Sequence, residues 1–291
     1  MALIVMSMSK NHNRLLAVAK LSLKLSGKYL QPYSCCKSPH LFTQPQLMTC
    51  LILRAYLKTT YRGVIEILET SEALREALDL RRIPHYSTLK YFVDKAGTLE
   101  IIDALLADIA KHYGRPNEPV AIDATGLQAT AASAYFQTRS GRKQKKYVKL
   151  SISVLCGSLL PAGLVLGFGP SNDKSDAYSL LLKTAQAVKP AKVYADAGYD
   201  AEWVHRFCRE LWDAKSFIPP AVHRADGGVN GKYRSQMTPR RLKCNGYTQR
   251  WKVESFMSAL KRTTGSMLQA RKTASMFREA ALRVLAYALR R

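Results

Sequence analysis

The sequence predicts an α/β protein in which a mixed sheet flanked by helices follows a small all-α domain. Two observations predict this class. The first third of the 291-residue chain carries apolar residues at three- and four-residue spacing, which is typical of amphipathic helices. After residues 114–119, short apolar runs of strand length alternate with helical patterns, which indicates a sheet with helices around it.

The first part of the chain is expected to form a helical domain over residues 1–115. Helices are expected at residues 13–25, 46–57, 61–68, 88–96 and 98–113. Ser87 is the expected N-cap of the fourth helix, and the Gly- and Pro-containing stretch 114–119 is the clearest linker in the chain. These short helices resemble a helix-turn-helix, but small helical domains without a DNA role have the same pattern. DNA binding and dimerisation are therefore both open as roles for this domain.

The second predicted domain covers residues 118–291 and has the sheet. Strands are expected at residues 120–126, 147–156, 159–168, 191–196 and 216–219, and helices at 173–188 and 201–211. This order of strand, hairpin, helix and strand resembles the ribonuclease H arrangement. A short insertion rich in Gly, Arg and Lys is expected near residues 218–245.

One apolar stretch, residues 151–170, has the length of a membrane-spanning helix. Glycines and Pro161 interrupt it, so two buried strands joined by a turn fit better. We therefore expect no membrane association and a cytoplasmic, nucleoid-associated prokaryotic protein. The six cysteines form no C-x-x-C pair, which argues against a zinc site and against a secreted disulfide framework.

The charge of the chain is strongly positive. Forty-five basic and 21 acidic residues leave a formal net charge of +24, which indicates a polyanionic partner, most often nucleic acid. The surplus is concentrated in two places. One is the stretch 240–291, and the other is the acid-free run 139–149, where a solvated loop is the alternative to DNA binding. The residues of this run that we expect to bind DNA are Arg142, Lys143, Lys145 and Lys146.

Two aspartates, Asp123 in A-I-D-A-T-G and Asp196 in Y-A-D-A-G-Y, end apolar strands. Ligands of open α/β sheets bind outside the carboxyl ends of the strands, and carboxylates there can hold Mg²⁺. Asp200 is the weaker candidate, because it is better placed to cap the next helix.

A third acid, Glu254, stands almost alone in the basic C-terminal stretch. On a helix, Tyr247, Arg250, Glu254 and Lys261 share one side, while Val253 and Leu260 point away. One carboxylate among several cations is a poor salt-bridge arrangement. It is explained if Glu254 completes a metal site while its neighbours hold the phosphates of a DNA strand.

These residues carry a family resemblance. The spacing Y-(2)-R-(3)-E-(6)-K of Tyr247, Arg250, Glu254 and Lys261 is similar to the signature of the D-D-E transposases of insertion sequences four and five and their relatives. The segments around Asp123 and Asp196 resemble the first and second Asp segments of that family, and the resemblance spans roughly residues 41–288.

The resemblance implies a ribonuclease H-like catalytic domain in which Asp123, Asp196 and Glu254 are catalytic and bind two Mg²⁺ or Mn²⁺ ions. It also implies cleavage of double-stranded DNA at the terminal inverted repeats of a transposon, and strand transfer into target DNA. A homodimer is expected in the DNA complex, because two transposon ends must meet. Two other functions stay open: a ribonuclease H-like nuclease without strand transfer, and a non-catalytic DNA-binding protein derived from a transposase.

Overall fold

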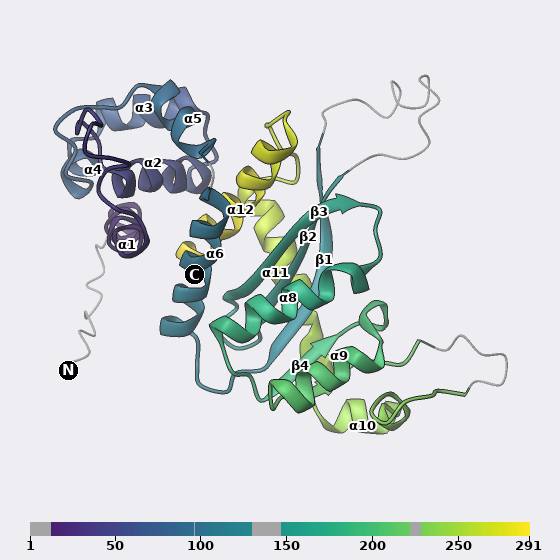
Figure 1. Ribbon diagram of the computed structural model, residues 1–291. Coiled ribbons are helices and arrows are strands. Elements are labelled where there is room, and N and C mark those ends of the chain that lie inside the picture. The colour runs from purple at the N-terminus through teal and green to yellow at the C-terminus, as the bar shows by residue number, and fades with distance from the viewer. Residues whose placement is uncertain (1–12, 96, 130–146, 222–227) are drawn as a thin grey trace, which may run out of the picture. The chain divides into compact units, whose positions relative to one another are not determined.

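The computed structural model describes residues 13–95, 97–129, 147–221 and 228–291. The chain divides into two compact units, one of Met1–Lys95 with Arg290 and one of Ala96–Leu289 with Arg291. Each unit has its own set of elements (Figure 1). No helix among the described residues is long and apolar enough to cross a membrane.

The first unit is entirely helical in its described part. Its helices are α1 (Arg14–Tyr29), α2 (Gln44–Tyr56), α3 (Tyr61–Thr70), α4 (Glu72–Ala77) and α5 (Tyr86–Val93). α2 is central: it packs against α1, α3 and α5, and a capping box between Thr43 and Gln46 begins it. The helix at α5 begins earlier than predicted, because the side chain of His85, and not Ser87, accepts the N-terminal hydrogen bond.

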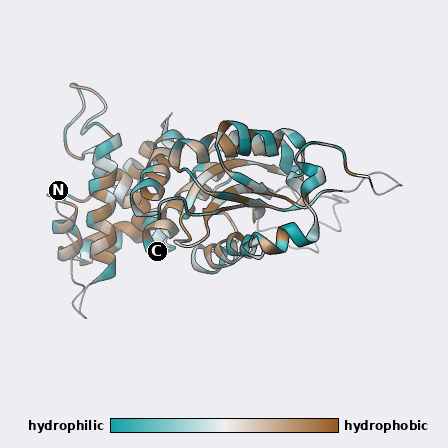
Figure 2. Ribbon diagram, turned by 90° about the horizontal axis from the view of Figure 1, so that it is seen from below, coloured by the Kyte–Doolittle hydropathy of each residue, from teal (hydrophilic) through white to brown (hydrophobic). Residues whose placement is uncertain are grey.

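The second unit is built on a five-stranded mixed sheet. Its strands are β1 (Val120–Gln128), β2 (Tyr147–Leu155), β3 (Pro161–Gly169), β4 (Lys192–Ala195) and β5 (Lys215–Phe217). They lie in the order β3-β2-β1-β4-β5, and β1, β2 and β3 are antiparallel neighbours, whereas β1, β4 and β5 run parallel. The predicted fold class is confirmed, and so is the hairpin at residues 147–169. Figure 2 shows that the strands are largely hydrophobic.

Helices cover both faces of this sheet. They are α6 (Thr98–Tyr113), α8 (Asp173–Ala187), α9 (Glu202–Arg206), α10 (Pro239–Cys244), α11 (Trp251–Thr264) and α12 (Thr273–Arg290). The side chains of a strand alternate between the two faces. On β2, Ser153 contacts Thr184 of α8, whereas Thr125 on β1 contacts Lys261 of α11 from the other face. α8 and α11 therefore pack on opposite faces.

α6 lies within the range that the sequence assigns to the helical domain, but its packing is with the sheet. It contacts β3 and α8, and Lys183 of α8 forms an ion pair with Asp103 of α6 at 2.5 Å. A helical periodicity identifies such a segment as a helix, but not the surface on which it packs.

A buried charge network joins α9 to the segment that follows β5. The Asp200 carboxylate is fully buried and accepts hydrogen bonds from Nε and Nη2 of Arg234 at 2.8 and 2.6 Å, and from the Ala221 N–H at 2.8 Å. The expectation that Asp200 caps the next helix is wrong, because α9 begins after Ala201, which makes no side-chain cap. Burial lowers the pKa of the neighbouring His205 to about 4, although the charge of Asp200 opposes this shift.

Candidate functional site

Asp123 and Asp196 occupy equivalent places on two neighbouring parallel strands. The last parallel pair between β1 and β4 joins Ile122 to Ala195, and each aspartate is the next residue along its strand. β1 does not end there as predicted. It continues to Gln128 because its pairing with β2 extends over all nine residues.

Each aspartate uses one carboxylate oxygen to order its own backbone. Oδ1 of Asp123 accepts a hydrogen bond from the Ala124 N–H at 2.8 Å. Oδ1 of Asp196 accepts one from the Gly198 N–H at 2.9 Å and so caps the short 3₁₀ turn η1 (Ala197–Tyr199). The second oxygen of each carboxylate is left for contacts in the site.

Glu254 comes to these aspartates through the start of α11. The segment is not one regular helix from Tyr247, since residues Tyr247–Arg250 form a 3₁₀ turn, η4, and α11 begins at Trp251. The Tyr247 hydroxyl donates a hydrogen bond to the Ala195 carbonyl at 3.1 Å and so ties η4 to the end of β4. Glu254 lies in the first turn of α11, where its carboxylate also interacts favourably with the helix dipole.

Arg250 lies between two of the acids. Its Nη1 is 3.5 Å from Oδ2 of Asp123, and its Nη2 is 2.5 Å from Oε1 of Glu254. The sequence does not predict such a salt bridge, because cations outnumber acids in this stretch. The structure differs: the guanidinium pairs with Glu254 one helical turn away, and it also contacts Asp123 of β1, which is distant in the sequence.

The charges of Asp196 and Glu254 both act on Asp123. The pKa of Asp123 is raised to about 6, first by burial and then by the charges of Asp196 and Glu254, although the Ala124 N–H and Arg250 oppose the shift. Burial also raises the pKa of Tyr247, and the same three acids contribute in that direction. The region around Asp123 therefore receives negative charge from Asp196 and Glu254, and additional positive charge there is favourable.

The donor chemistry of this region fits a hard divalent cation, because carboxylate oxygens are the ligands that Mg²⁺ prefers. Within the described ranges, however, no three His, Cys, Asp or Glu side chains converge closely enough to hold a metal ion. Arg250 supplies the positive charge between Asp123 and Glu254 in this arrangement.

The predicted DNA-binding cations come from two parts of the chain, the C-terminal stretch 240–291 and the basic run 139–149, and the structure describes only the first set. Lys261 donates a hydrogen bond to the Thr125 hydroxyl at 2.6 Å, beside Asp123 on β1, and burial lowers its pKa. Arg142, Lys143, Lys145 and Lys146 lie outside the described residues. Lys149, the last residue of the same basic run, is buried and forms ion pairs with Asp173 and Asp176. This lysine is therefore not part of a cationic surface.

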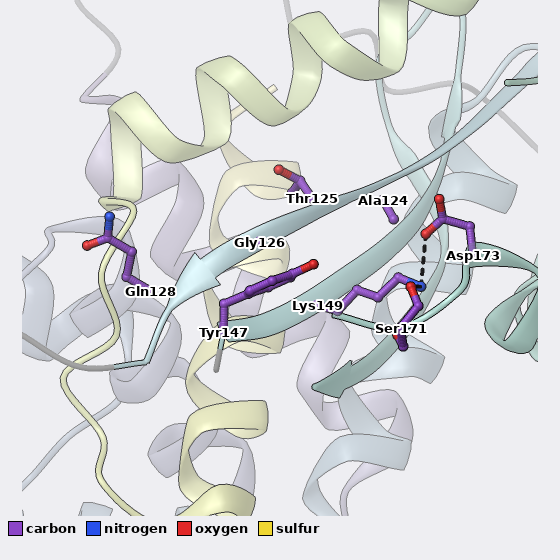
Figure 3. A pocket seen from close by; sticks show the side chains of 8 residues that line it. All are labelled: Ala124, Thr125, Gly126, Gln128, Tyr147, Lys149, Ser171 and Asp173. Atoms are coloured by element: carbon purple, nitrogen blue, oxygen red, sulfur yellow. Dashed lines mark hydrogen bonds and ion pairs between the residues drawn. The ribbon is translucent and has the colours of Figure 1, made fainter. Parts of the chain in front are cut away.

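A cavity of about 590 Å³ opens along the part of β1 that follows Asp123. Figure 3 shows the Lys149–Asp173 ion pair on its wall and the Tyr147 ring across from it. The lining residues are Ala124, Thr125, Gly126, Gln128, Tyr147, Lys149, Ser171 and Asp173. Gly126 lets the ring lie flat on β1, because a Cβ there would come within 2.7 Å of it. No sequence pattern singled out this cavity, since its walls come from three segments that are distant in the chain.

Comparison with known proteins gives a family match and a structural likeness. The pattern of the family described as Transposase DDE domain matches residues 114–289, which is more than half of the chain. The cryo-EM structure of the piggyBac transposase synaptic complex with hairpin DNA is similar with a TM-score of 0.49 and 9% sequence identity, over 95% of this chain and 71% of that one. Among curated proteins, none matches.

Proposed function

The chain belongs to the transposase DDE domain family, and from this premise we propose that it cuts DNA at the ends of a transposable element and joins the freed ends to target DNA. Terminal inverted repeats and a target duplex are then its two DNA substrates. Asp123, Asp196 and Glu254 are its catalytic carboxylates. The signature of Tyr247, Arg250, Glu254 and Lys261 assigns it more narrowly to the relatives of insertion sequences four and five.

One observation carries the proposal more than any other. Asp123 and Asp196 directly follow the last parallel pair of β1 and β4, and the hydrogen bond from Tyr247 to Ala195 holds the start of α11 at that same edge. Two acids from distant segments, Asp196 and Glu254, thus add to the effect of burial and raise the pKa of Asp123. Such a concentration of like charge is costly to folding and is typical of a functional site.

Asp123, Asp196 and Glu254 would hold two Mg²⁺ or Mn²⁺ ions. When bound, such ions activate the attacking water or 3′-hydroxyl and stabilise the leaving oxygen of a phosphodiester. Arg250 pairs with two of these carboxylates, Asp123 and Glu254, and its guanidinium would be available to a phosphate once bound cations take over that charge.

The cationic residues of this site are proposed to hold the DNA strand. Lys261 contacts Thr125, two residues after Asp123 on β1, and Arg250 contacts Asp123 directly. Tyr247 belongs to the same group, although its hydroxyl would exchange the Ala195 carbonyl for a phosphate oxygen. DNA binding by the basic run 139–149 stays a prediction, with Arg142, Lys143, Lys145 and Lys146 as its DNA-binding residues.

The test uses a labelled DNA with the terminal inverted repeats of the element. Mg²⁺-dependent cleavage and joining are expected from the wild-type chain, and chelation of the metal is expected to stop both. Glu254→Gln keeps the shape of the side chain but removes its charge, so cleavage should fall at least about 1,000-fold while DNA binding is retained.

The alternatives predict other products. A nuclease without strand transfer cleaves and yields no joined DNA, and a non-catalytic DNA-binding protein binds the repeats without cutting them in either form. Cleavage by Glu254→Gln at the wild-type rate would contradict a catalytic role for Glu254. Joined products from two repeat ends, recovered with two copies of the chain, would support the expected homodimer.

We further propose that the helical unit binds DNA through α3 and α5. The Arg62 guanidinium stacks on the Tyr86 ring, 4.5 Å from its centroid, and donates to its hydroxyl at 3.3 Å. Lys90 and Tyr91 lie on the same hollow, and Tyr91 is 74% exposed. A pre-oriented guanidinium beside an exposed aromatic ring and a lysine suits a phosphate backbone.

Replacing Arg62 with alanine is expected to weaken DNA binding and to lower the salt dependence of the affinity by about one phosphate contact. Affinity titrations at several salt concentrations measure both quantities. Lys24→Ala is the matched control, because Lys24 is an exposed cation on α1, which packs on α2 and α4 instead. An equal effect of both substitutions would argue for general charge attraction rather than a binding face.

A further inference from the structure

Lys149 is a buried lysine on β2, and its ammonium is enclosed by acceptors. The residue is 3% exposed. Its Nζ lies 2.9 Å from Oδ1 of Asp173 and 3.0 Å from Oδ2 of Asp176, and it donates to the carbonyls of Ser171 and Asn172 at 3.2 and 3.1 Å. We call Lys149, Asp173 and Asp176 the lysine clamp, because they join the middle of the sheet to the first turn of α8 (Figure 3).

The lysine clamp attaches a helix to a sheet at a considerable cost in free energy. Burying a charge costs free energy, and a well-packed apolar contact is often at least as stable as a buried ion pair. Burial works against the charge of Lys149, but its hydrogen bonds and the charges of Asp173 and Asp176 outweigh this and raise its pKa. One ammonium and two carboxylates leave a net negative charge at the cluster, so stability alone is a weak explanation for it.

The lysine clamp adjoins the turn that carries Asp196. A Cβ atom placed on Gly198 would lie 3.1 Å from Oδ2 of Asp173 and 3.0 Å from Oδ1 of Asp196. Both carboxylates thus lie close to this glycine, and Asp196 also accepts a hydrogen bond from its N–H. Asp173 is pinned by Lys149 through its other oxygen, so a shift of Asp173 would change the space available to the turn.

Tyr199 connects the lysine clamp to both candidate aspartates. It closes the turn η1, is 1% exposed, and packs where α8 meets that turn. Its pKa is raised by burial first and then by the charges of Asp173, Asp123 and Asp196. An acid of the lysine clamp and two acids of the candidate site therefore face one phenol group.

We propose that Lys149 is a positioning residue for Asp196, which it holds in place through Asp173 and the Gly198 turn. The functional part of this inference rests on the proposed transposase activity, whereas its structural part does not. Asp176 completes the clamp: it accepts a hydrogen bond from Ser151 at 2.9 Å and holds the ammonium from the second side.

The first test is the exchange of backbone hydrogens in residues 196–200. Lys149→Met removes the ammonium and keeps an unbranched apolar side chain, and we expect it to speed exchange in this segment at least tenfold. Cleavage of the repeat DNA should fall at least tenfold without a change in DNA affinity. Asp173→Asn should act in the same direction, and the double variant should be no worse than the poorer single variant, because both residues act as one unit.

Lys183→Met is the matched control. Lys183 lies on α8, like the two acids of the lysine clamp. It pairs with Asp103 and donates to the Leu164 carbonyl at 3.0 Å, but it does not contact the turn. It should leave exchange in 196–200 and cleavage unchanged, and Lys149→Arg, which keeps the charge, should restore part of the wild-type behaviour. Asp173→Asn retains the Lys149–Asp176 pair and serves as the test if Lys149→Met does not fold.

Unchanged exchange in residues 196–200 of a folded Lys149→Met or Asp173→Asn protein would overturn the proposal. So would cleavage at the wild-type rate per folded molecule. Failure of the wild-type chain to cleave any repeat DNA would instead contradict the proposed function, and the exchange measurement would still decide whether the clamp holds the turn.

Discussion

Replacing Asp123 with asparagine is expected to reduce the rate of DNA cleavage at least about 1,000-fold, which corresponds to about 4 kcal/mol of transition-state stabilisation. Asparagine has nearly the same shape, so the backbone contact to Ala124 can be kept while the charge is lost. Loss of that charge removes a proposed metal ligand. It also takes away one of the two acids that Arg250 contacts, so that Glu254 remains. Cleavage should fail for both reasons, while DNA affinity stays close to that of the wild type.

Single-turnover cleavage of the repeat DNA measures this effect, together with the thermal stability of each variant. Because the three carboxylates act as one unit, Asp123→Asn combined with Glu254→Gln should be no slower than the poorer single variant. Asp103→Asn removes an acid of α6 that pairs with Lys183 and not with Arg250, so this variant should cleave normally. Multiplicative losses in the double variant, or cleavage by Asp123→Asn within threefold of the wild type, would contradict a shared site.

Replacing Arg234 with methionine is expected to lower the free energy of unfolding by about 3–5 kcal/mol, because it leaves the buried carboxylate of Asp200 without its partner. The Asp200 side chain is fully buried and accepts from two nitrogens of Arg234. The remaining Ala221 N–H cannot compensate for a full charge. The neighbouring His205 has its pKa lowered by burial, so it is a poor replacement cation at neutral pH.

Urea denaturation of the wild-type chain and the Arg234→Met variant gives the difference. Adding Asp200→Asn to Arg234→Met removes the unpaired charge and should recover at least half of the loss. Arg206→Met is the control, because Arg206 is an exposed cation on the adjoining helix α9. A loss below about 1 kcal/mol in Arg234→Met would show that water reaches Asp200, in conflict with its burial.

Much of the fold follows from local patterns. The apolar runs at 147–156 and 159–168 became a hairpin because glycines and Pro161 rule out a helix there, and the helical periodicity of 13–25 and 98–113 became α1 and α6. Boundaries were less predictable. His85, not Ser87, is the N-cap of α5, which begins at Tyr86. η4 separates Tyr247 from α11, since tertiary contacts such as Tyr247 with Ala195 decide where a helix can start.

By itself, the sequence determined the fold class, the cationic character of the chain and the place of Asp196 directly after a strand, whereas Asp123 lies inside β1. These properties depend on composition, on periodicity and on the direction of parallel strands, all of which are local or additive. Only the tertiary structure decided which charges meet. Arg250 pairs with Asp123, which is 127 residues away in the sequence. Lys149 belongs to a basic run, yet it is buried and pairs with Asp173 and Asp176. The reason is physical: a buried charge must find its partner in space, and strand register and helix packing, rather than neighbours in the chain, place that partner.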